Sequence, residues 1–250
     1  VVSRMRLSGQ VGVPVVSAIS DLAALWYWAH PGCDLHLVIH PESAAEIRAI
    51  AGAAARIEAV RGITDPAFET PRDRSEARAG LGLPEHGPIV VVSGGGWGVG
   101  DLQGAVAATL AADHAATIVA LCGHNERALT DLQGAFASEP RVRPQGFTDR
   151  MPDLLAAADV LIHATAGLTV FEALVRGVRV ISFGWGVGHI RINNEAYRRF
   201  GLADVVADPG DLSAAVRRAI DSPREPDLAY GTRPAAADLI IALGRGQNRV

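Results

Sequence analysis

The strongest constraint on this chain is an alternation of short β-branched runs with longer stretches of helical pattern. Eight apolar runs are typical of strands, at 13–19, 34–40, 55–60, 88–93, 116–122, 141–147, 159–164 and 178–183. Helical patterns follow many of them, at 41–52, 101–113, 125–139, 167–177 and 211–222. Because nearly continuous apolar strands joined by helices form βαβ units, the pattern predicts an α/β protein with parallel sheets covered on both faces.

Composition excludes several partners and chemistries. The net charge of −4 gives no electrostatic reason to expect a nucleic acid as partner. Every basic side chain is arginine, which excludes a lysine-based mechanism. Cys33 and Cys122 are far apart and lack metal-ligand companions, so we expect free thiols in a reducing cytoplasm. No apolar run approaches the roughly 20 residues that would cross a bilayer.

A segment rich in proline and charge, at 64–87, divides the pattern into two parts. The first part has only about three strands, few for an independent domain of this class, so we expect it to lack its front half. The apolar stretch 235–244 either closes the second domain or packs on the first. The expected division is 1–70 as the remaining C-terminal half of an N-terminal acceptor domain, 71–87 as a linker, 88–225 as a doubly wound domain and 226–250 as a helical tail.

The stretch "VVVSGGGWGVGDLQGAV" (90–106) runs from a predicted strand through five glycines into a predicted helix. Glycines allow a ligand to approach the backbone, and a helix N-terminus attracts a diphosphate. The spacing matches neither G-x-G-x-x-G nor G-x-x-x-x-G-K-[ST], so neither an NAD site nor a P-loop is indicated. A plain tight turn between strand and helix would need about two of these glycines. Because there are five, we favour a phosphate site over a tight turn. Asp101 would cap the helix and repel a phosphate there, so we expect the anion at 94–97.

A second block, "GFTDRMPDLLAAADVLIHATAGLTVFEAL" (146–174), directs more groups to the same sheet edge. Phe147 ends a strand, where it either covers a ligand's base or belongs to the core. A small-residue turn then leads into a helix in which Glu172 shares a face with Leu168 and Thr169. Because its neighbours are apolar, this carboxylate needs a hydroxyl-bearing partner, and a ribose diol would supply one.

The stretch "GWGVGHIRINN" (184–194) is predicted to be a glycine-rich loop. It would present His189, Arg191, Asn193 and Asn194 to sugar hydroxyls and phosphate. No second metal ligand stands at a suitable spacing from His189, so we expect no metal site there. His163 lies inside an apolar strand and is predicted to be buried.

These blocks together resemble the C-terminal donor domain of family-28 glycosyltransferases, over roughly residues 88–222. The resemblance implies a GT-B fold, in which two Rossmann-like domains have doubly wound parallel sheets, the first domain here being truncated. It implies a UDP-sugar donor and no metal cofactor. The residues that would contact the donor are Gly94, Gly95, Gly96 and Trp97 at the diphosphate, Phe147 and Thr148 at the uracil, Gly167, Leu168 and Thr169 at the phosphates, Glu172 at the ribose, and His189 and Asn193 at the sugar.

Two departures from the family pattern concern the residues at the donor sugar and those in the acceptor domain. In the branch of the family that glycosylates diacylglycerol, a G-Q-x-x-x-N element contacts the donor sugar. Here Gly188 and His189 replace its Gly-Gln pair. The stretch "VPVVSAISDLAALWYW" (13–28) resembles the V-x-T-D-x-x-x-H-x-x-W pattern of that branch. Ser20, Asp21 and Trp28 align with it, and Leu25 stands at the histidine position. We take Asp21 as the general base, since the acceptor alcohol must lose its proton.

The resemblance implies transfer of a hexose from a UDP-sugar to a lipid such as diacylglycerol, with inversion, at the cytoplasmic face of a membrane. The stretch 25–30, "LWYWAH", would meet that membrane or pack into a domain interface. Two other functions stay open. A sugar-nucleotide epimerase of GT-B fold needs carboxylates and a histidine in a complete cleft, which the stretch 184–194 fits poorly. An inactive UDP-sugar-binding module would bind the donor without transfer.

Overall fold

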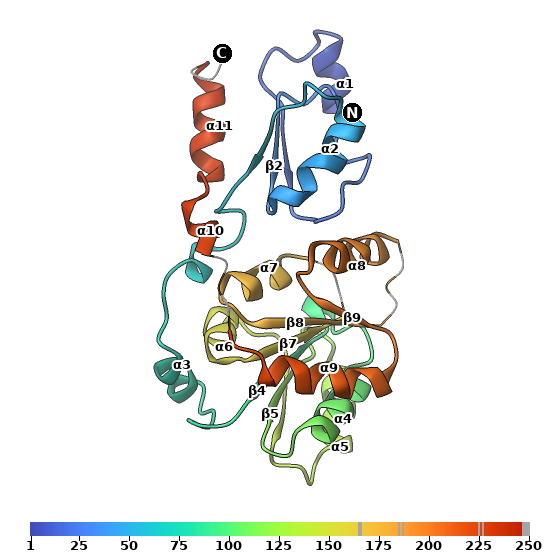
Figure 1. Cartoon of the computed structure of the whole chain (residues 1–250), viewed down its shortest axis with the longest axis vertical. Coiled ribbons are helices and arrows are strands. Elements are labelled where there is room, and N and C mark those ends of the chain that lie inside the picture. Colours follow the sequence, from blue (N-terminus) through green and yellow to red (C-terminus); the bar gives the residue numbers. More distant parts are fainter. Residues whose placement is uncertain (165–166, 185, 187, 225, 227, 247–250) are drawn as a thin grey trace. The chain divides into compact units, whose positions relative to one another are not determined.

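The computed structural model describes residues 1–164, 167–184, 186, 188–224, 226 and 228–246. The chain divides into two compact units, one of Val1–Pro66 with Leu228–Val250 and the other of Ala67–Asp227 (Figure 1). Each unit is built on one parallel sheet. The α/β class predicted from the alternation is confirmed.

The first unit has a three-stranded sheet in the order β1-β2-β3. Its strands are β1 (Val16–Ile19), β2 (Leu35–Val38) and β3 (Ile57–Ala59). The middle strand is buried along its whole length, as its run of apolar residues predicts. Helix α2 (Ala44–Ala51) buries Ile47 and Ala51 in the core formed on the sheet. A short helix α1 (Val2–Leu7) precedes the first strand.

The C-terminal helices α10 (Leu228–Thr232) and α11 (Ala236–Gly244) belong to this first unit (Figure 1). Residues Ala236, Leu239 and Leu243 join a core cluster with Leu35, Leu37 and Val60. A parallel bridge between Arg61 and Ala235 fixes the start of α11. The apolar stretch 235–244 therefore packs on the first unit and does not close the second.

The second unit has a six-stranded parallel sheet in the order β6-β5-β4-β7-β8-β9. The strands are β4 (Ile89–Ser93), β5 (Thr117–Leu121), β6 (Val142–Gln145), β7 (Val160–His163), β8 (Arg179–Phe183) and β9 (Asp204–Val206). Every residue of β4, β5 and β7 is buried, which explains their uninterrupted apolar runs. The strand order reverses between β4 and β7, which makes this point the topological switch of a doubly wound fold.

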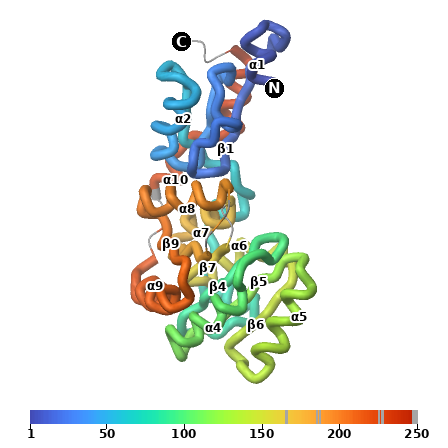
Figure 2. The backbone as a smooth tube through the Cα atoms, turned by 90° about the vertical axis from the view of Figure 1, so that its right-hand side faces the viewer, coloured from blue at the N-terminus to red at the C-terminus, as the bar shows by residue number. Residues whose placement is uncertain are grey.

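Helices cover both faces of this sheet. Helices α4 (Leu102–Ala112), α5 (Glu126–Ala135) and α9 (Pro209–Asp221) share one core cluster on one face. Helices α6 (Met151–Ala157) and α7 (Leu168–Val175) pack together on the other, so that α7 and α9 lie on opposite sides of β8 (Figure 1). Figure 2 shows α4 and α5 beside β4 to β6. The chain therefore leaves β4 and β7 toward opposite faces, which opens a crevice at their carboxyl ends.

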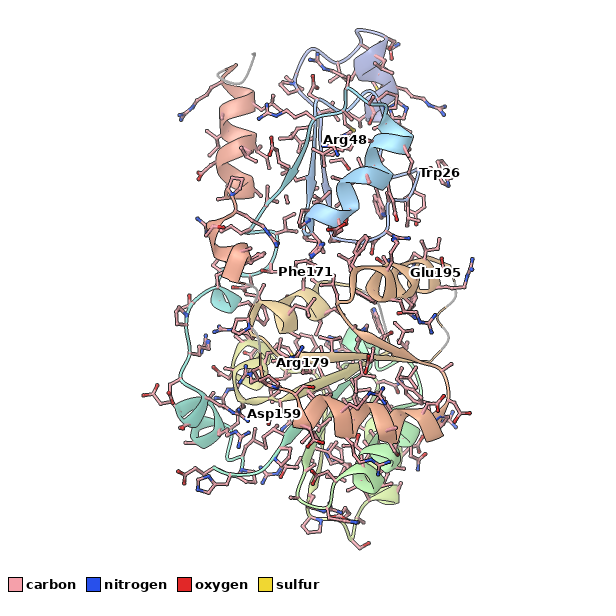
Figure 3. All side chains as sticks on the ribbon, viewed as in Figure 1. Trp26, Arg48, Asp159, Phe171, Arg179 and Glu195 are labelled. Carbon is pink, nitrogen blue, oxygen red and sulfur yellow. The ribbon has the colours of Figure 1, made fainter. Side chains whose placement is uncertain are left out.

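The segment 71–87 is part of the second unit, which corrects the expectation of a linker. Its helix α3 (Arg74–Gly80) packs against α6. The buried Arg78 donates to Asp159 at 3.1 Å and to three carbonyls of the segment that follows α3. Asp159, labelled in Figure 3, also accepts from the amide of Ile89 at 2.9 Å. These bonds fix the segment to the amino edge of the sheet.

Helix α8 (His189–Phe200) replaces the end of the glycine-rich loop that was predicted at 184–194. That prediction is wrong from His189 onward. The helix buries Asn193, Asn194, Ala196 and Tyr197, whose spacing follows one helical face. Two of these four residues are asparagines, so the stretch looked too polar to be an amphipathic helix. Trp185 and Val187 lie outside the described residues.

Candidate functional site

The parallel strands direct the predicted donor residues of the second unit to the carboxyl edge of its sheet. Gly94 to Trp97 follow β4, Phe147 and Thr148 follow β6, and Gly167 precedes α7 after β7. His189 begins α8 after β8. In open α/β sheets ligands bind outside this edge, at the switch point. The predicted donor residues therefore follow four strands of this sheet, β4, β6, β7 and β8.

Most glycines of the turn after β4 are required by the turn itself. A 3₁₀ turn spans Gly95–Trp97, and Gly95 has a φ of 68°. A Cβ added at Gly94 would lie 2.6 Å from the backbone of Gly98. One added at Gly98 would lie 2.2 Å from the Cys122 carbonyl oxygen, and one at Gly100 would lie 2.3 Å from the Cβ of Ala164. Gly96 differs, because a Cβ there would meet nothing within 4 Å. The fold therefore needs glycine at four of the five positions and leaves Gly96 unexplained by packing.

Several amides of this turn already have partners within the protein. Gly94 donates to the Leu121 carbonyl at 3.2 Å, and Gly95 donates to the Ser93 hydroxyl at 3.2 Å. Asp101 caps α4 by accepting from the Gly104 amide at 2.7 Å. A diphosphate at Gly94 and Gly95 would have to displace these bonds. Packing and internal hydrogen bonds therefore account for much of this turn, and the phosphate contact at 94–97 stays a prediction.

The helices that begin at this edge differ in their side-chain caps, and Arg150 at the start of α6 provides none. The side chains of Asp101, Asn125 and Asp208 cap α4, α5 and α9. Within the described residues, no side chain caps α7, which begins after Gly167, or α8, which begins after Gly188. The first-turn amides and the positive end of the dipole attract an anion there. The sequence correctly predicted a second helix N-terminus at this edge; Thr165 and Ala166 lie outside the described residues.

Glu172 lies in α7 at the predicted spacing from Leu168 and Thr169, and it is half-buried. Since α7 and α4 cover opposite faces, Glu172 and the glycine turn approach the carboxyl edge from the two sides of the sheet. One ligand can contact both only by lying across this edge, at the crevice between β4 and β7.

A cavity of about 260 Å³ opens at the carboxyl edge. It is lined by Gly100, Asp101, Ala164, Phe183, Gly184, Gly186, Ala207 and Pro209. Its volume is slightly below the roughly 300–1,000 Å³ of small-molecule sites, and the Asp101 carboxylate disfavours an anion inside it. The open amides of α7 are a better phosphate site than this cavity.

A larger cavity of about 610 Å³ lies at the opposite, amino edge, beside the starts of β8 and β9. Three arginines line it, Arg179, Arg198 and Arg218, together with Asp204. The C-terminal ends of α7, α8 and α9 also meet there, and their negative dipole ends offset the arginine charges. Arg198 and Arg218 lie in the last turns of α8 and α9, where basic residues are ordinary stabilising features, and Arg218 also pairs with Asp204.

Three aromatic rings gather at the carboxyl edge from the loops after β4, β5 and β6. The rings of His124 and Phe147 are stacked, with centroids 4.3 Å apart and planes 12° apart. The Trp97 ring lies 6.1 Å from His124 at a tilt of 58°. Phe147 is 62% exposed and Trp97 77% exposed, so Phe147 is not a core residue. His124 was not among the predicted site residues, although "GHN" (123–125) directly follows the predicted strand 116–122, which became the neighbour of β4.

The residues predicted to contact the donor sugar are arranged differently from the expectation. His189 is exposed at the first turn of α8. Asn193 is 1% exposed and donates to the His189 carbonyl at 3.0 Å. Asn194 accepts from the Ser182 hydroxyl at 2.6 Å. The two asparagines therefore support the start of α8 and are not presented to solvent. Thr148 accepts from the Arg150 amide at 3.0 Å.

Asp21 lies in the first unit, after β1. Its carboxylate accepts a hydrogen bond from the indole of Trp28 at 3.0 Å, so two residues of the N-terminal pattern are in contact. Leu25, at the histidine position of that pattern, is buried and offers no group for proton transfer. Trp26 is 76% exposed and projects from the ribbon in Figure 3, and Tyr27 contacts both tryptophans edge-on.

Further chemistry at the described residues is limited. Cys33 and Cys122 are free thiols, as predicted, and burial raises the pKa of the Cys122 thiol. Among the described residues, no three His, Cys, Asp or Glu side chains gather as metal ligands would. None of the described helices combines the length and apolar character of a membrane span.

No protein-family model matches the chain. It is 33% identical over 143 residues to a UDP-N-acetylglucosamine--N-acetylmuramyl-(pentapeptide) pyrophosphoryl-undecaprenol N-acetylglucosamine transferase of Rhodococcus opacus, covering 56% of this chain and 37% of the relative. It is 29% identical over 159 residues to monogalactosyldiacylglycerol synthase 1 of Arabidopsis thaliana, covering 60% and 30%. A processive diacylglycerol beta-glucosyltransferase of Staphylococcus epidermidis is 22% identical over 94% of this chain and 63% of its own length. The chain thus spans about a third of the first two relatives.

Solved structures have the same fold. The MurG structure of Acinetobacter baumannii has a TM-score of 0.61 at 16% identity, covering 96% of this chain and 68% of that one. The Anabaena Alr3699/HepE structure, in complex with UDP and glucose, has a TM-score of 0.56 at 15% identity, covering 95% and 72%. The resemblance to family-28 glycosyltransferases and the GT-B fold class are confirmed by these relatives and structures.

Proposed function

We propose that this chain carries the UDP-sugar site of a glycosyltransferase that transfers a hexose to the hydroxyl of a lipid such as diacylglycerol, with inversion. The names of the relatives support this proposal, since they describe transfer to an undecaprenol-linked acceptor, to diacylglycerol, and synthesis of a galactolipid. The UDP bound in the structure of similar fold supports the nucleotide.

One observation carries the proposal. No side chain of the described residues caps α7 at the switch point, and Glu172 lies one turn further along this helix. The diphosphate would lie on the amides at the start of α7, and Glu172 would accept the ribose hydroxyls. Phe147, exposed after β6, would stack on the uracil. In this proposal the partners of the phosphate, the ribose and the base lie along one carboxyl edge.

The reaction would proceed by direct displacement. The acceptor oxygen forms a bond to the anomeric carbon while the bond from that carbon to the diphosphate oxygen breaks, and UDP leaves with the electron pair. The first-turn amides of α7 stabilise the charge that develops on UDP, which is often the largest catalytic contribution. The acceptor proton would pass to Asp21, whose carboxylate Trp28 holds by a hydrogen bond of 3.0 Å. No metal ion takes part in this scheme.

The lipid acceptor would bring the first unit to the cytoplasmic face of a membrane, as a peripheral contact. Trp26, Tyr27 and Trp28 are exposed in the loop after β1. Tryptophan and tyrosine are enriched where a membrane meets water, because their rings are apolar at one end and polar at the other. These three residues are the surface we assign to that contact.

A transfer assay tests the proposal. The purified chain is incubated with a UDP-hexose and vesicles that contain diacylglycerol, and glycolipid and UDP are measured together. We expect both products in equal amounts from the wild type, and loss of both in Glu172→Gln. Glu76→Gln, which removes an exposed carboxylate from α3, serves as the matched control and should retain activity. An epimerised nucleotide sugar without glycolipid would overturn the proposal, and so would UDP binding without any turnover.

A further inference from the structure

His124 is tied to the glycine turn by its backbone and to Phe147 by its ring. Its amide donates to the Gly96 carbonyl at 2.8 Å. The next residue, Asn125, caps α5 and also donates to the Gly98 carbonyl at 3.4 Å. The backbone of His124 is therefore fixed between the loop after β4 and the start of α5. Its imidazole then reaches the ring of Phe147 in the loop after β6.

The stack of His124 on Phe147 has no role in the hydrophobic core. Both residues are exposed, and neither belongs to the core cluster of this unit. An exposed phenylalanine gains little from burial where it stands. The near-parallel rings, 4.3 Å between centroids and 12° between planes, instead restrict the Phe147 ring to one plane. With His124 against one side of Phe147, the 62% of Phe147 that remains exposed is available to another planar group.

We propose that His124 is a positioning residue of the donor site, which holds Phe147 in the plane where the base of a nucleoside diphosphate stacks. This inference rests on the proposed function and deepens it, because it assigns base recognition to a residue outside the phosphate and ribose contacts. Recognition through a stack depends on the ring of the base and not on the diphosphate. His124 therefore affects affinity for a nucleotide and leaves affinity for inorganic diphosphate unchanged.

Calorimetric titration of the whole chain with UDP and with inorganic diphosphate tests this assignment. The proteins are the wild type, His124→Ala, His124→Phe, Phe147→Ala and the double variant of His124→Ala with Phe147→Ala. We expect His124→Ala to weaken UDP binding about 3- to 10-fold, the range of an aromatic pair. His124→Phe, which keeps a planar ring, should restore affinity to within about twofold of the wild type. Diphosphate affinity should stay within about twofold throughout, since no stack is involved.

The double variant separates positioning from a merely structural role. Because His124 acts through Phe147, its replacement should have no further effect once Phe147 is alanine. Unchanged UDP affinity in His124→Ala, no rescue by His124→Phe, or additive losses in the double variant would each overturn the inference while UDP still binds the wild type. Parallel weakening of diphosphate would also overturn it, because the whole edge would then be disturbed. A wild type that binds no UDP contradicts the proposed function itself, and the inference with it.

Discussion

His36 lies in the middle strand of the first sheet and is completely buried. Its Nε2 accepts a hydrogen bond from the His30 amide at 3.2 Å, and its Nδ1 has no hydrogen-bond partner among the described residues. Burial, more than any nearby charge, lowers the pKa of His36 below its ordinary value. The imidazole is therefore held neutral in the folded first unit.

This burial predicts a pH dependence of stability. As the pH falls below about 6.5, the unfolded chain binds a proton on His36 that the folded chain does not yet bind, so stability is lost. The loss ends once the pH falls below the lowered pKa of the folded state. His36→Gln, which keeps an acceptor and cannot titrate, should show a shallower fall in melting temperature between pH 7 and pH 5. Equal slopes for the two proteins would contradict this account.

The glycines of the turn after β4 show which features could be predicted from the sequence and which could not. The sequence predicted the turn, its strand and its helix start at Asp101. It could not predict that Gly98 faces the Cys122 carbonyl or that Gly100 faces Ala164, because these contacts come from other loops. Steric demand from distant residues thus accounts for glycines that looked like ligand contacts. For the same reason the stack of His124 on Phe147 could not be derived from spacing.

At the scale of elements, the caps of the helices determine where an anion can bind. Asp101 occupies the start of α4 and lines the 260 Å³ cavity at the carboxyl edge. Asp101→Asn retains a good capping side chain and removes the negative charge. We expect an unchanged melting temperature and UDP affinity about two- to fivefold higher at low salt, with the gain reduced by added salt. Calorimetric titration at two salt concentrations measures the gain in UDP affinity and its reduction by salt.

The matched control is Asp73→Asn, which changes the cap of α3 in the same way. Asp73 accepts from the Glu76 amide on a helix that packs against α6 and not at the carboxyl edge. Its replacement should leave UDP affinity unchanged. A similar gain in both variants would mean that overall charge, and not the position of Asp101, sets the affinity.

The elements that the sequence predicted are those with strong apolar periods. The run 88–93 became β4 and the run 167–177 became α7, with ends shifted by one or two residues. The strand β9 has only three residues at the sheet edge, too short for a clear signal. Helix α8 was missed because asparagines lie on its buried face, where Asn194 bonds to Ser182. Buried polar residues whose hydrogen bonds are made inside the protein leave no hydrophobic pattern in the sequence.

At the scale of the whole molecule, the buried Arg78 is one of several arginines that bond the segment 71–87 to the rest of the second unit. Arg78 and the more exposed Arg74 both bond to Asp159. Arg78→Met removes a buried cation and with it the hydrogen bonds to Asp159 and to several backbone carbonyls. This change should lower the free energy of unfolding by about 3–5 kcal/mol. Arg74→Met, whose side chain is 40% exposed, should cost below about 1 kcal/mol. Urea unfolding of the two variants measures the difference, and equal losses would contradict it.

The division into units could not be derived from the sequence alone. The proline- and charge-rich composition of 64–87 indicated a linker, yet the bonds of Arg78 make most of it part of the second unit. The apolar stretch 235–244 gave two alternatives, and the core cluster that Ala236 shares with Leu35 and Val60 shows that it packs on the first unit. Such choices depend on contacts between residues far apart in the chain. The parallel sheets needed no such information, because periodicity alone specifies them.

The most direct test of the central claim is calorimetric titration of the chain with UDP and with NAD. The first-turn amides of α7, which no described side chain caps, and Glu172 together predict tighter binding of UDP than of NAD. Loss of hydrogen bonds to a charged group should weaken UDP binding in Glu172→Gln by about 10- to 100-fold, while Glu76→Gln should bind like the wild type. Tighter binding of NAD, or UDP affinity that Glu172→Gln does not change, would contradict the claim that this carboxyl edge binds UDP.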